Sequence, residues 1–310
     1  MLDDEDDIPE IDWDALGNVY VFANGKGGVG KTSAATNLAG LVAADGGQVL
    51  YVDVNGQGNG GNDLGYRHGP QDDEGKALHD ALATGSPLVP VRGIRPGLDV
   101  IVGGPMVGNL PNMLSATFPF ADKRQALALA ISLAPIAGHY DTVFIDSAPE
   151  NKPLQQLALG AARWMIAPTK TDPGSIEGLG HISHQFSLVR RKVNPNLTLL
   201  GVVLFATGSN ATQLQKRARE AVAQELGTAD LLFETFIRHA EAVGADTRRH
   251  GKLVHELEMA AASNPKFWDL RAGRAAGGTV ISTTSASVAE DYANLAREIL
   301  TRAAEQDALA

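Results

Sequence analysis

The 310-residue sequence predicts an α/β fold, a mainly parallel twisted sheet with helices on both faces. Two features predict it. Short apolar runs rich in β-branched residues recur along the chain, and stretches with helical spacing of apolar residues lie between them. Continuous apolar runs suit strands buried on both faces, and their alternation with helices implies β-α-β units and a parallel sheet.

The expected strands are spread over the first two thirds of the chain. They are residues 18–24, 48–54, 98–103, 141–146, 164–169 and 199–205. A helix should follow the first strand over residues 31–47, because Ala35, Leu38 and Val42 fall on one face. Gly46 and Gly47 should end it, since glycine is common just after the last residue of a helix.

Two further helices are expected, one over residues 121–136 that ends near Pro135 and one from about Ser285 onward. Residues 55–75 are rich in Gly, Asn and Asp and should form a loop. No stretch resembles a linker between domains. We therefore expect a single domain over residues 18–310, with a Gly/Ala-rich insertion near residues 260–284.

The charge is concentrated at the N-terminus. The net charge is −10, and residues 1–16 contain eight acidic residues and no lysine or arginine. Such a composition predicts a disordered acidic tail over residues 1–17. The remaining chain is nearly neutral and leaves room for a local basic patch.

The composition excludes several classes of function. The chain has no cysteine, which excludes disulfides, iron–sulfur clusters, thiolate metal sites and cysteine nucleophiles. No apolar run is long enough to span a bilayer, and the acidic N-terminus is unlike a secretory signal. We expect a soluble, cytoplasmic protein that does not bind membranes.

A phosphate-binding loop lies between the first expected strand and the first expected helix. Gly25 to Thr32 reads G-x-x-x-x-G-K-T, the full P-loop pattern in the context that supports it. Backbone N–H groups of such a loop surround the phosphates of a nucleoside triphosphate. The expected nucleotide-binding residues are Gly27, Gly28, Val29, Gly30, Lys31, Thr32 and Ser33.

Three side chains of this loop have separate expected roles. Lys31 should reach the β- and γ-phosphates, Thr32 should ligate Mg²⁺, and Ser33 should add a hydroxyl at the α-phosphate. Asp146 ends the expected strand 141–146 and should hold the same Mg²⁺, directly or through water.

Lys26 is a second lysine inside the loop, which ordinary P-loops do not need. Residues 26–32, "KGGVGKT", resemble the K-G-G-x-G-K-[ST] loop of the deviant Walker A ATPases of the ParA/MinD family. The resemblance continues in "YVDVNGQGN", "YDTVFIDSAPE", "APTKTDPGSIEGLGHI" and "ETFIRHAEAVGADTRRHGKLVHELE". It is greatest to short plasmid-type ParA proteins, which lack a sequence-specific DNA domain of their own.

The resemblance implies a catalytic group of residues. It implies that Lys26 crosses a homodimer interface to the ATP of the partner, and that Asp53 acts at the metal and in catalysis as the first acid of the family's D-x-D-P-Q-G-N segment. The second acid, which helps hydrolysis in the family, is replaced here by Asn55, and the proline by Gly56. We expect slow hydrolysis; the alternative is a tolerated variant in which another group serves.

ATP and Mg²⁺ are the cofactors that the resemblance implies. Many relatives have an asparagine that helps to bind adenine at the position of Phe205, so the base contacts must differ here. Arg238, in the "IRHA" segment, is expected near the base; the alternative is a surface arginine.

Basic residues late in the chain are candidate contacts to DNA phosphates. In the family such residues bind DNA non-specifically once ATP drives dimerisation, and phosphate contacts need no base readout. The alternative for each cluster is a solvated helix face. The candidates are Lys216, Arg217 and Arg219 in one cluster, diluted by nearby acids, and Arg248, Arg249 and Lys252 in a second, better one.

The sequence thus predicts a ParA-like ATPase that forms an ATP-sandwich homodimer, binds DNA non-specifically and positions DNA with a ParB-like partner, in the cytoplasm on the nucleoid. The alternative is a slowly or non-hydrolysing nucleotide-switched scaffold, MinD-like or orphan ParA-like, that positions a protein cargo. A small-molecule P-loop enzyme such as a dethiobiotin synthetase is a third candidate, and Lys26 argues against it.

Overall fold

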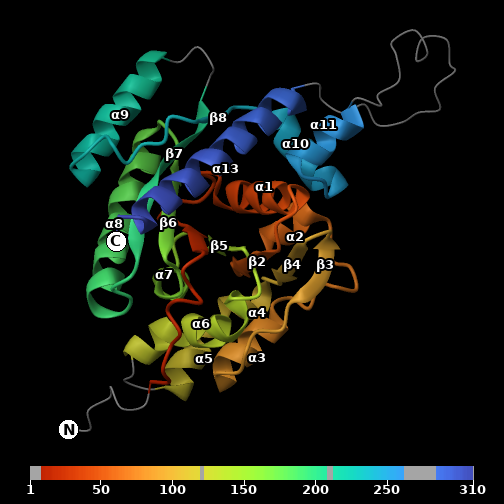
Figure 1. Ribbon diagram of the computed structural model, residues 1–310, viewed down its shortest axis with the longest axis vertical. Helices are drawn as coiled ribbons and strands as arrows, with labels where there is room; N and C mark the ends of the chain where they lie inside the picture. The colour runs from red at the N-terminus through yellow and green to blue at the C-terminus, as the bar shows by residue number, and fades with distance from the viewer. Residues whose placement is uncertain (1–7, 119–121, 208–211, 262–283, 310) are drawn as a thin grey trace, which may run out of the picture.

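The computed structural model describes residues 8–118, 122–207, 212–261 and 284–309 of the chain. Eight strands form one sheet in the order β3-β4-β2-β5-β1-β6-β7-β8 (Figure 1). Neighbouring strands run parallel, except that β3 and β4 are antiparallel. The strands are β1 (Val19–Phe22), β2 (Val49–Val54), β3 (Val91–Arg95), β4 (Leu98–Ile101), β5 (Thr142–Ser147), β6 (Trp164–Thr169), β7 (Thr198–Thr207) and β8 (Ile237–Arg238).

Helices cover both faces of this sheet. They are α1 (Lys31–Ala44), α2 (Asn59–Leu64), α3 (Lys76–Thr84), α4 (Pro105–Gly108), α5 (Leu110–Thr117), α6 (Asp122–Ala137), α7 (Lys152–Gly160), α8 (Pro173–Lys192), α9 (Thr212–Leu226), α10 (Glu241–His250), α11 (Val254–Ala261) and α13 (Ser285–Asp307). In Figure 1, α1 and α13 lie on one side of the sheet, and α3, α5 and α6 lie on the other.

Alternation along the strands divides the core into two layers. In β1, Val19 and Val21 face the layer that includes α6 and α7, whereas Tyr20 and Phe22 face the layer that includes α1 and α13. Successive side chains of a strand point to opposite faces, so a strand between two helical layers must be apolar at every position. This confirms the α/β class predicted from the continuous apolar runs.

The six predicted strands are confirmed, and two strands were not predicted. Strand β3 carries Arg92, Gly93 and Arg95 and is only partly buried, because it lies at the edge of the sheet. Strand β8 has only two residues. Neither has the apolar run by which a central strand is recognised.

Two expectations about glycine-rich segments meet different outcomes. Helix α1 ends at Ala44 and is followed by Gly46 with φ 102°, as the glycine pair predicted. The loop expected over residues 55–75 is wrong in part, because α2 lies within it. Helix α2 is bounded by Gly58 and Gly65, which both have left-handed backbone conformations. The abundance of glycine in this stretch had suggested a loop.

The expectation of a disordered tail over residues 1–17 is wrong for residues 8–17. Residues 8–17 pack on the domain: Leu16 is 2% exposed, and Ile8, Ile11 and Trp13 contact the core. The indole of Trp164 also donates to the carbonyl of Gly17 at 3.1 Å. Four apolar side chains anchor this acidic segment. Most of the expected insertion, residues 262–283, lies outside the described residues.

Within the described ranges, no helix has both the length and the apolar character that crossing a bilayer requires.

Candidate nucleotide-binding site

The candidate site lies at the carboxyl ends of β1, β5 and β2. From β1 the chain crosses to β2 through α1, and from β5 it crosses to β6 through α7, so these two neighbouring strands continue in opposite directions across the sheet. Ligands of open α/β sheets bind at such a reversal of strand order. Asn24 shapes the turn after β1. Its amide donates to the carbonyl of Pro168 at 2.8 Å, and its Oδ1 accepts from the Lys26 N–H at 2.9 Å.

The backbone of the P-loop favours glycine at two positions, and at one of them packing requires it as well. Gly28 and Gly30 have φ of 73° and 100°, a region that disfavours side chains. A Cβ on Gly30 would also lie 2.3 Å from the ring of Phe205. Phe205 therefore packs directly beneath the loop, which then enters the N-terminus of α1.

Lys31 folds back on the loop. Its Nζ donates to the carbonyl of Lys26 at 2.7 Å, and the residue is only 5% exposed. Burial lowers the pKa of Lys31 to about 8, while Asp146 and Glu150 act in the opposite direction. A bound phosphate would offer this buried ammonium a charged partner in place of a neutral carbonyl.

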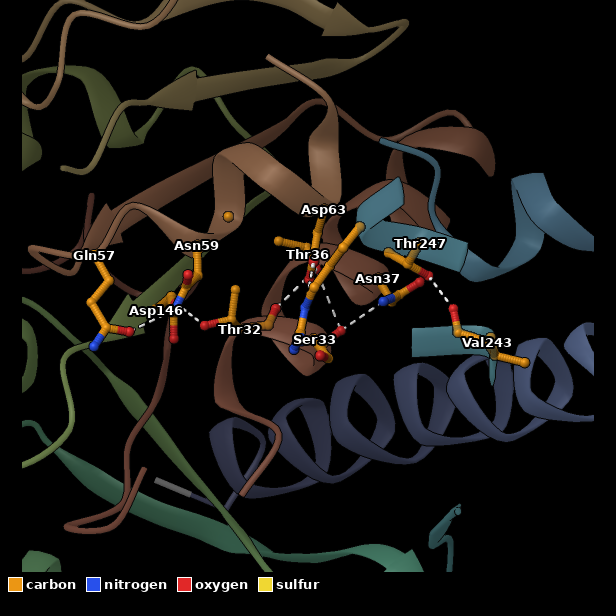
Figure 2. A network of polar contacts seen from close by, with 12 residues as sticks. Thr32, Ser33, Thr36, Asn37, Gln57, Asn59, Asp63, Asp146, Val243 and Thr247 are labelled. Carbon is orange, nitrogen blue, oxygen red and sulfur yellow. Dashed lines mark hydrogen bonds and ion pairs between the residues drawn. The ribbon is translucent and has the colours of Figure 1, made fainter. Parts of the chain in front are cut away.

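Two carboxylates meet in the core beneath the loop. Asp53 at the end of β2 lies opposite Asp146 at the end of β5, and both are fully buried. The Thr32 hydroxyl donates to Asp146 Oδ2 at 2.5 Å, as Figure 2 shows, and the Gly60 N–H donates to Asp53 Oδ2 at 3.2 Å. The other oxygen of each carboxylate has no hydrogen-bond partner.

Burial and mutual repulsion disfavour ionisation of this pair. Burial raises the pKa of Asp146 to about 7, and burial followed by the charge of Asp146 raises that of Asp53 well above its ordinary value. Unpartnered carboxylate oxygens beside a threonine hydroxyl are the hard ligands that Mg²⁺ prefers. Thr32, Asp53 and Asp146, the three expected metal residues, are therefore brought together, and they fit a divalent cation.

Asn55 lies in the phosphate pocket but is engaged within its own loop. Its Oδ1 accepts from the Gln57 N–H at 3.0 Å, and the Asn59 amide donates to Gln57 Oε1 at 2.8 Å (Figure 2). The pocket has a volume of about 360 Å³ and is lined by residues of the P-loop and by Asn55, Gln57 and Asn59, which follow β2. A Cβ on Gly56 would lie 3.2 Å from the Gly108 backbone, so a larger residue there would press on α4.

A second cavity of about 310 Å³ adjoins the phosphate pocket. Phe205, Val288 and Tyr292 form an apolar wall, and α10 forms another side. An apolar cleft beside a P-loop suits a nucleobase. The residues that line both cavities are Gly28, Gly30, Ser33, Asp63 and Arg248.

Arg238, which was expected near the base, lines this second cavity, and its side chain is held by Asp291. Nε and Nη2 donate to the two carboxylate oxygens at 2.7 Å each, and the Arg238 N–H donates at 3.0 Å. The guanidinium thereby joins β8 to α13.

Lys26 extends away from the phosphate pocket. Its Nζ lies 3.0 Å from Asp172 Oδ1, and both side chains are more than 40% exposed. Asp172 also caps α8, and hydrogen bonds from Ser175, followed by Lys26, lower its pKa to about 2. The second lysine of the loop thus lies on the outer surface, where another molecule can reach it.

The two basic clusters lie on separate parts of the fold. Helix α9 packs against α8 and β7, whereas α10 packs against α2 and α11. Lys216 and Arg217 are exposed, and Arg219 pairs with Glu234 at 3.2 Å. Arg249 and Lys252 are exposed, but Arg248 lies at the rim of the nucleotide cavities.

Asp63, Val288 and Tyr292 belong to the site and were not predicted. Asp63 lies in a glycine-rich stretch, which carries no catalytic pattern of its own. Val288 and Tyr292 fall on the core-facing side of the last helix, where they read as packing residues. Only the packing of α2 and α13 beside the loop brings them to the nucleotide cavities.

Fold and site together define a P-loop nucleoside-triphosphate-binding protein. A protein-family model described as "AAA domain" matches residues 17–199. The chromosome partitioning protein ParA of Myxococcus xanthus is 30% identical over 207 residues, 65% of this chain and 69% of that protein. The chromosome-partitioning ATPase Soj of Thermus thermophilus is 35% identical over 183 residues, 59% of this chain and 67% of that protein.

Solved structures share the fold at low sequence identity. A complex of a Cyanothece McdA variant with ATP has a TM-score of 0.67 at 19% identity and covers 92% of this chain and 96% of that one. pNOB8 ParA has a TM-score of 0.62 at 18% identity, and the match covers 94% of this chain and 99% of that one. The chain belongs to the ParA/MinD family of ATPases, as the resemblance of residues 26–32 indicated.

Proposed function

We propose that this protein is a partition ATPase whose ATP-bound homodimer binds DNA without sequence preference and is reset by hydrolysis with a ParB-like partner. Its family membership supports the ATPase activity and the general role in partition. The single observation that carries the dimer is the position of Lys26, exposed outside the phosphate pocket although it belongs to the loop.

The charge of Lys26 gives a reason for dimerisation to depend on ATP. Two triphosphates that face each other across an interface repel, and a lysine from each side offsets this repulsion. The pair with Asp172 is largely exposed and therefore weak, so it costs little to exchange.

The catalytic step depends on positioning and electrostatics. Mg²⁺ held by Thr32, Asp53 and Asp146 would neutralise charge on the phosphates, and Lys31 would bind their terminal oxygens. Asn55 would position the attacking water through a neutral amide. Because an amide is a weaker acceptor than a carboxylate, we propose slow intrinsic hydrolysis.

DNA contacts are proposed for the exposed basic residues of α9 and α10. The second cluster, which includes Arg249 and Lys252, has the higher density of charge around an exposed helix end. Since these contacts are to phosphates, binding should weaken steeply with salt.

Filter binding or anisotropy with two unrelated duplexes, each with ATP, ADP and no nucleotide, tests this function. We expect binding to both duplexes with ATP alone, and a similar loss on both for Arg249→Ala with Lys252→Ala. Absence of DNA binding with ATP at low salt would reject the partition function.

A nucleotide-switched scaffold that places a protein cargo is the second candidate, and the specific observation that favours it is Asn55. The same assay separates the two. A protein that dimerises with ATP, binds no DNA and hydrolyses almost none of its nucleotide would be the scaffold.

A further inference from the structure

Asp63 and Arg248 lie where the phosphate pocket meets the base cavity. Both residues line both cavities, together with Gly28, Gly30 and Ser33 of the P-loop. Asp63 is on α2 and Arg248 is on α10, so the two cavities are joined by side chains that come from outside the loop. Figure 2 shows Asp63 directly beside Thr36 and close to Ser33, on the side of α1 that faces the site.

Asp63 is a buried carboxylate with no strong partner. It is 3% exposed, its Oδ1 lies 3.9 Å from Arg248 Nε, and its Oδ2 lies 3.3 Å from the Thr36 hydroxyl. That hydroxyl has one proton, and the Thr32 carbonyl lies nearer, at 2.9 Å. Burial raises the pKa of Asp63 to about 6 even though Arg248 and Thr36 act against it.

Arg248 is held loosely. Its side chain is 71% exposed, and 3.9 Å is too long for a hydrogen bond to Asp63. Asp63 is buried, but the guanidinium is mostly in water, and at this length the two charges attract each other only weakly. The guanidinium can therefore reorient at small cost while its helix stays in place.

The helix that carries Arg248 is fixed against the nucleotide site. Gly65 after α2 and Gly251 after α10 meet so closely that a Cβ on Gly251 would lie 2.4 Å from the Gly65 Cα. Arg95 donates to the carbonyls of Leu64 and Gly251 at 3.1 and 2.9 Å and pairs with Glu256. Since α2 directly follows residues 55–58, which include Asn55 and Gln57 of the phosphate pocket, these contacts tie the helix of Arg248 to that pocket.

We propose that Arg248 is a nucleotide-binding residue, which exchanges its contact with Asp63 for the phosphates nearest the nucleoside when nucleotide binds. The proposal rests on the proposed ATP-binding function and reassigns Arg248 away from the DNA-binding surface. Arg248 lines both cavities together with Ser33, and this shared lining supports the α- and β-phosphates as its ligands.

The chemistry of the two groups favours this exchange. A guanidinium can donate two parallel hydrogen bonds to phosphate oxygens. Here Arg248 lies 3.9 Å from its carboxylate partner, close to the longest distance of an ion pair. A phosphate would thus be the stronger ligand for Arg248. Asp63 would then lose its cation and gain an anionic neighbour, so it opposes nucleotide binding.

Calorimetric titration of the full chain with ADP and with AMPPNP, both with Mg²⁺, tests the proposal. We expect Arg248→Ala to weaken the binding of both nucleotides by about tenfold, the effect of losing one charge-assisted hydrogen bond. Arg248→Lys should recover part of this loss. Arg249→Ala removes the same charge from the same helix and should weaken binding less than Arg248→Ala.

Asp63→Asn supplies an independent measurement, because it should tighten nucleotide binding rather than weaken it. Binding of both nucleotides by Arg248→Ala as tightly as by the wild type would overturn the proposal. A loss confined to AMPPNP would also overturn it, since Arg248 would then contact the terminal phosphate. A wild type that binds neither nucleotide would instead refute the proposed ATP-binding function itself.

Discussion

Replacement of Asp63 by asparagine should stabilise the protein at neutral pH, although it alters a residue of the site. The folded protein holds the Asp63 proton up to about pH 6, whereas the carboxyl of an unfolded chain has an ordinary pKa of 3.8. Folding therefore takes up a proton between these values, and the stability falls as the pH rises through about 6. Asparagine carries no charge at any pH and escapes this loss.

The expected magnitude follows from the pKa difference. Each pH unit of difference corresponds to about 1.4 kcal/mol, so ionisation of Asp63 costs roughly 3 kcal/mol in total. About half of this cost, roughly 1.4 kcal/mol, arises between pH 5 and pH 8. The other half arises below pH 5, where the carboxyl of the unfolded chain ionises and that of the folded protein does not. Asp63 also raises the pKa of Asp146, so its removal acts there with the same sign.

Urea unfolding without nucleotide or Mg²⁺, at intervals from pH 5 to pH 8, measures this effect. The free energy of unfolding of Asp63→Asn relative to the wild type should rise with pH by about 1 to 2 kcal/mol. Asp45→Asn, at the exposed end of α1, is the control for a change of net charge. A difference that is constant with pH, or that falls, would show that Asp63 is not a buried, destabilising charge.

Three further outcomes are expected. Lys26→Ala should bind ATP but remain monomeric; light scattering that shows an ATP-bound dimer of this variant would reject the role of Lys26 across the interface. Asn55→Asp should hydrolyse ATP faster in single turnover, by roughly tenfold or more if a carboxylate orients the water; a wild type of equal rate would show that Asn55 does not slow hydrolysis. Asp146→Asn should remove the tightening of nucleotide binding by Mg²⁺, measured by titration with and without chelator, and an unchanged Mg²⁺ effect would place the ion elsewhere.

The phosphate-binding part of the site could be predicted because it is local in sequence. Gly27 to Ser33 form one continuous stretch, the turn after β1 and the first residues of α1, and their spacing alone defines the phosphate-binding loop. Asp146 was predicted because it ends an apolar strand. Its neighbour across the sheet, Asp53, was placed through the family resemblance, and the register of β2 with β5 brings the two carboxylates together.

Other residues of the site had no local signal. The structure joins Asp63 and Arg248 although 185 positions separate them, and Arg248 read as one member of a basic cluster. Arg238 lines the second cavity, and its ion pair with Asp291 depends on how α13 lies across β8. A sequence shows that a residue is charged, and it does not show which helix will pack beside it.

The sequence by itself thus determined the six central strands, the first helix and the phosphate-binding loop, because each depends on apolar periodicity or backbone geometry over a few consecutive residues. Tertiary structure alone decided the apolar wall of the second cavity, the outward position of Lys26 and the contact of Arg248 with Asp63. These depend on the packing of α2, α8, α10 and α13, and therefore on distances between segments that neighbour one another only after the chain has folded.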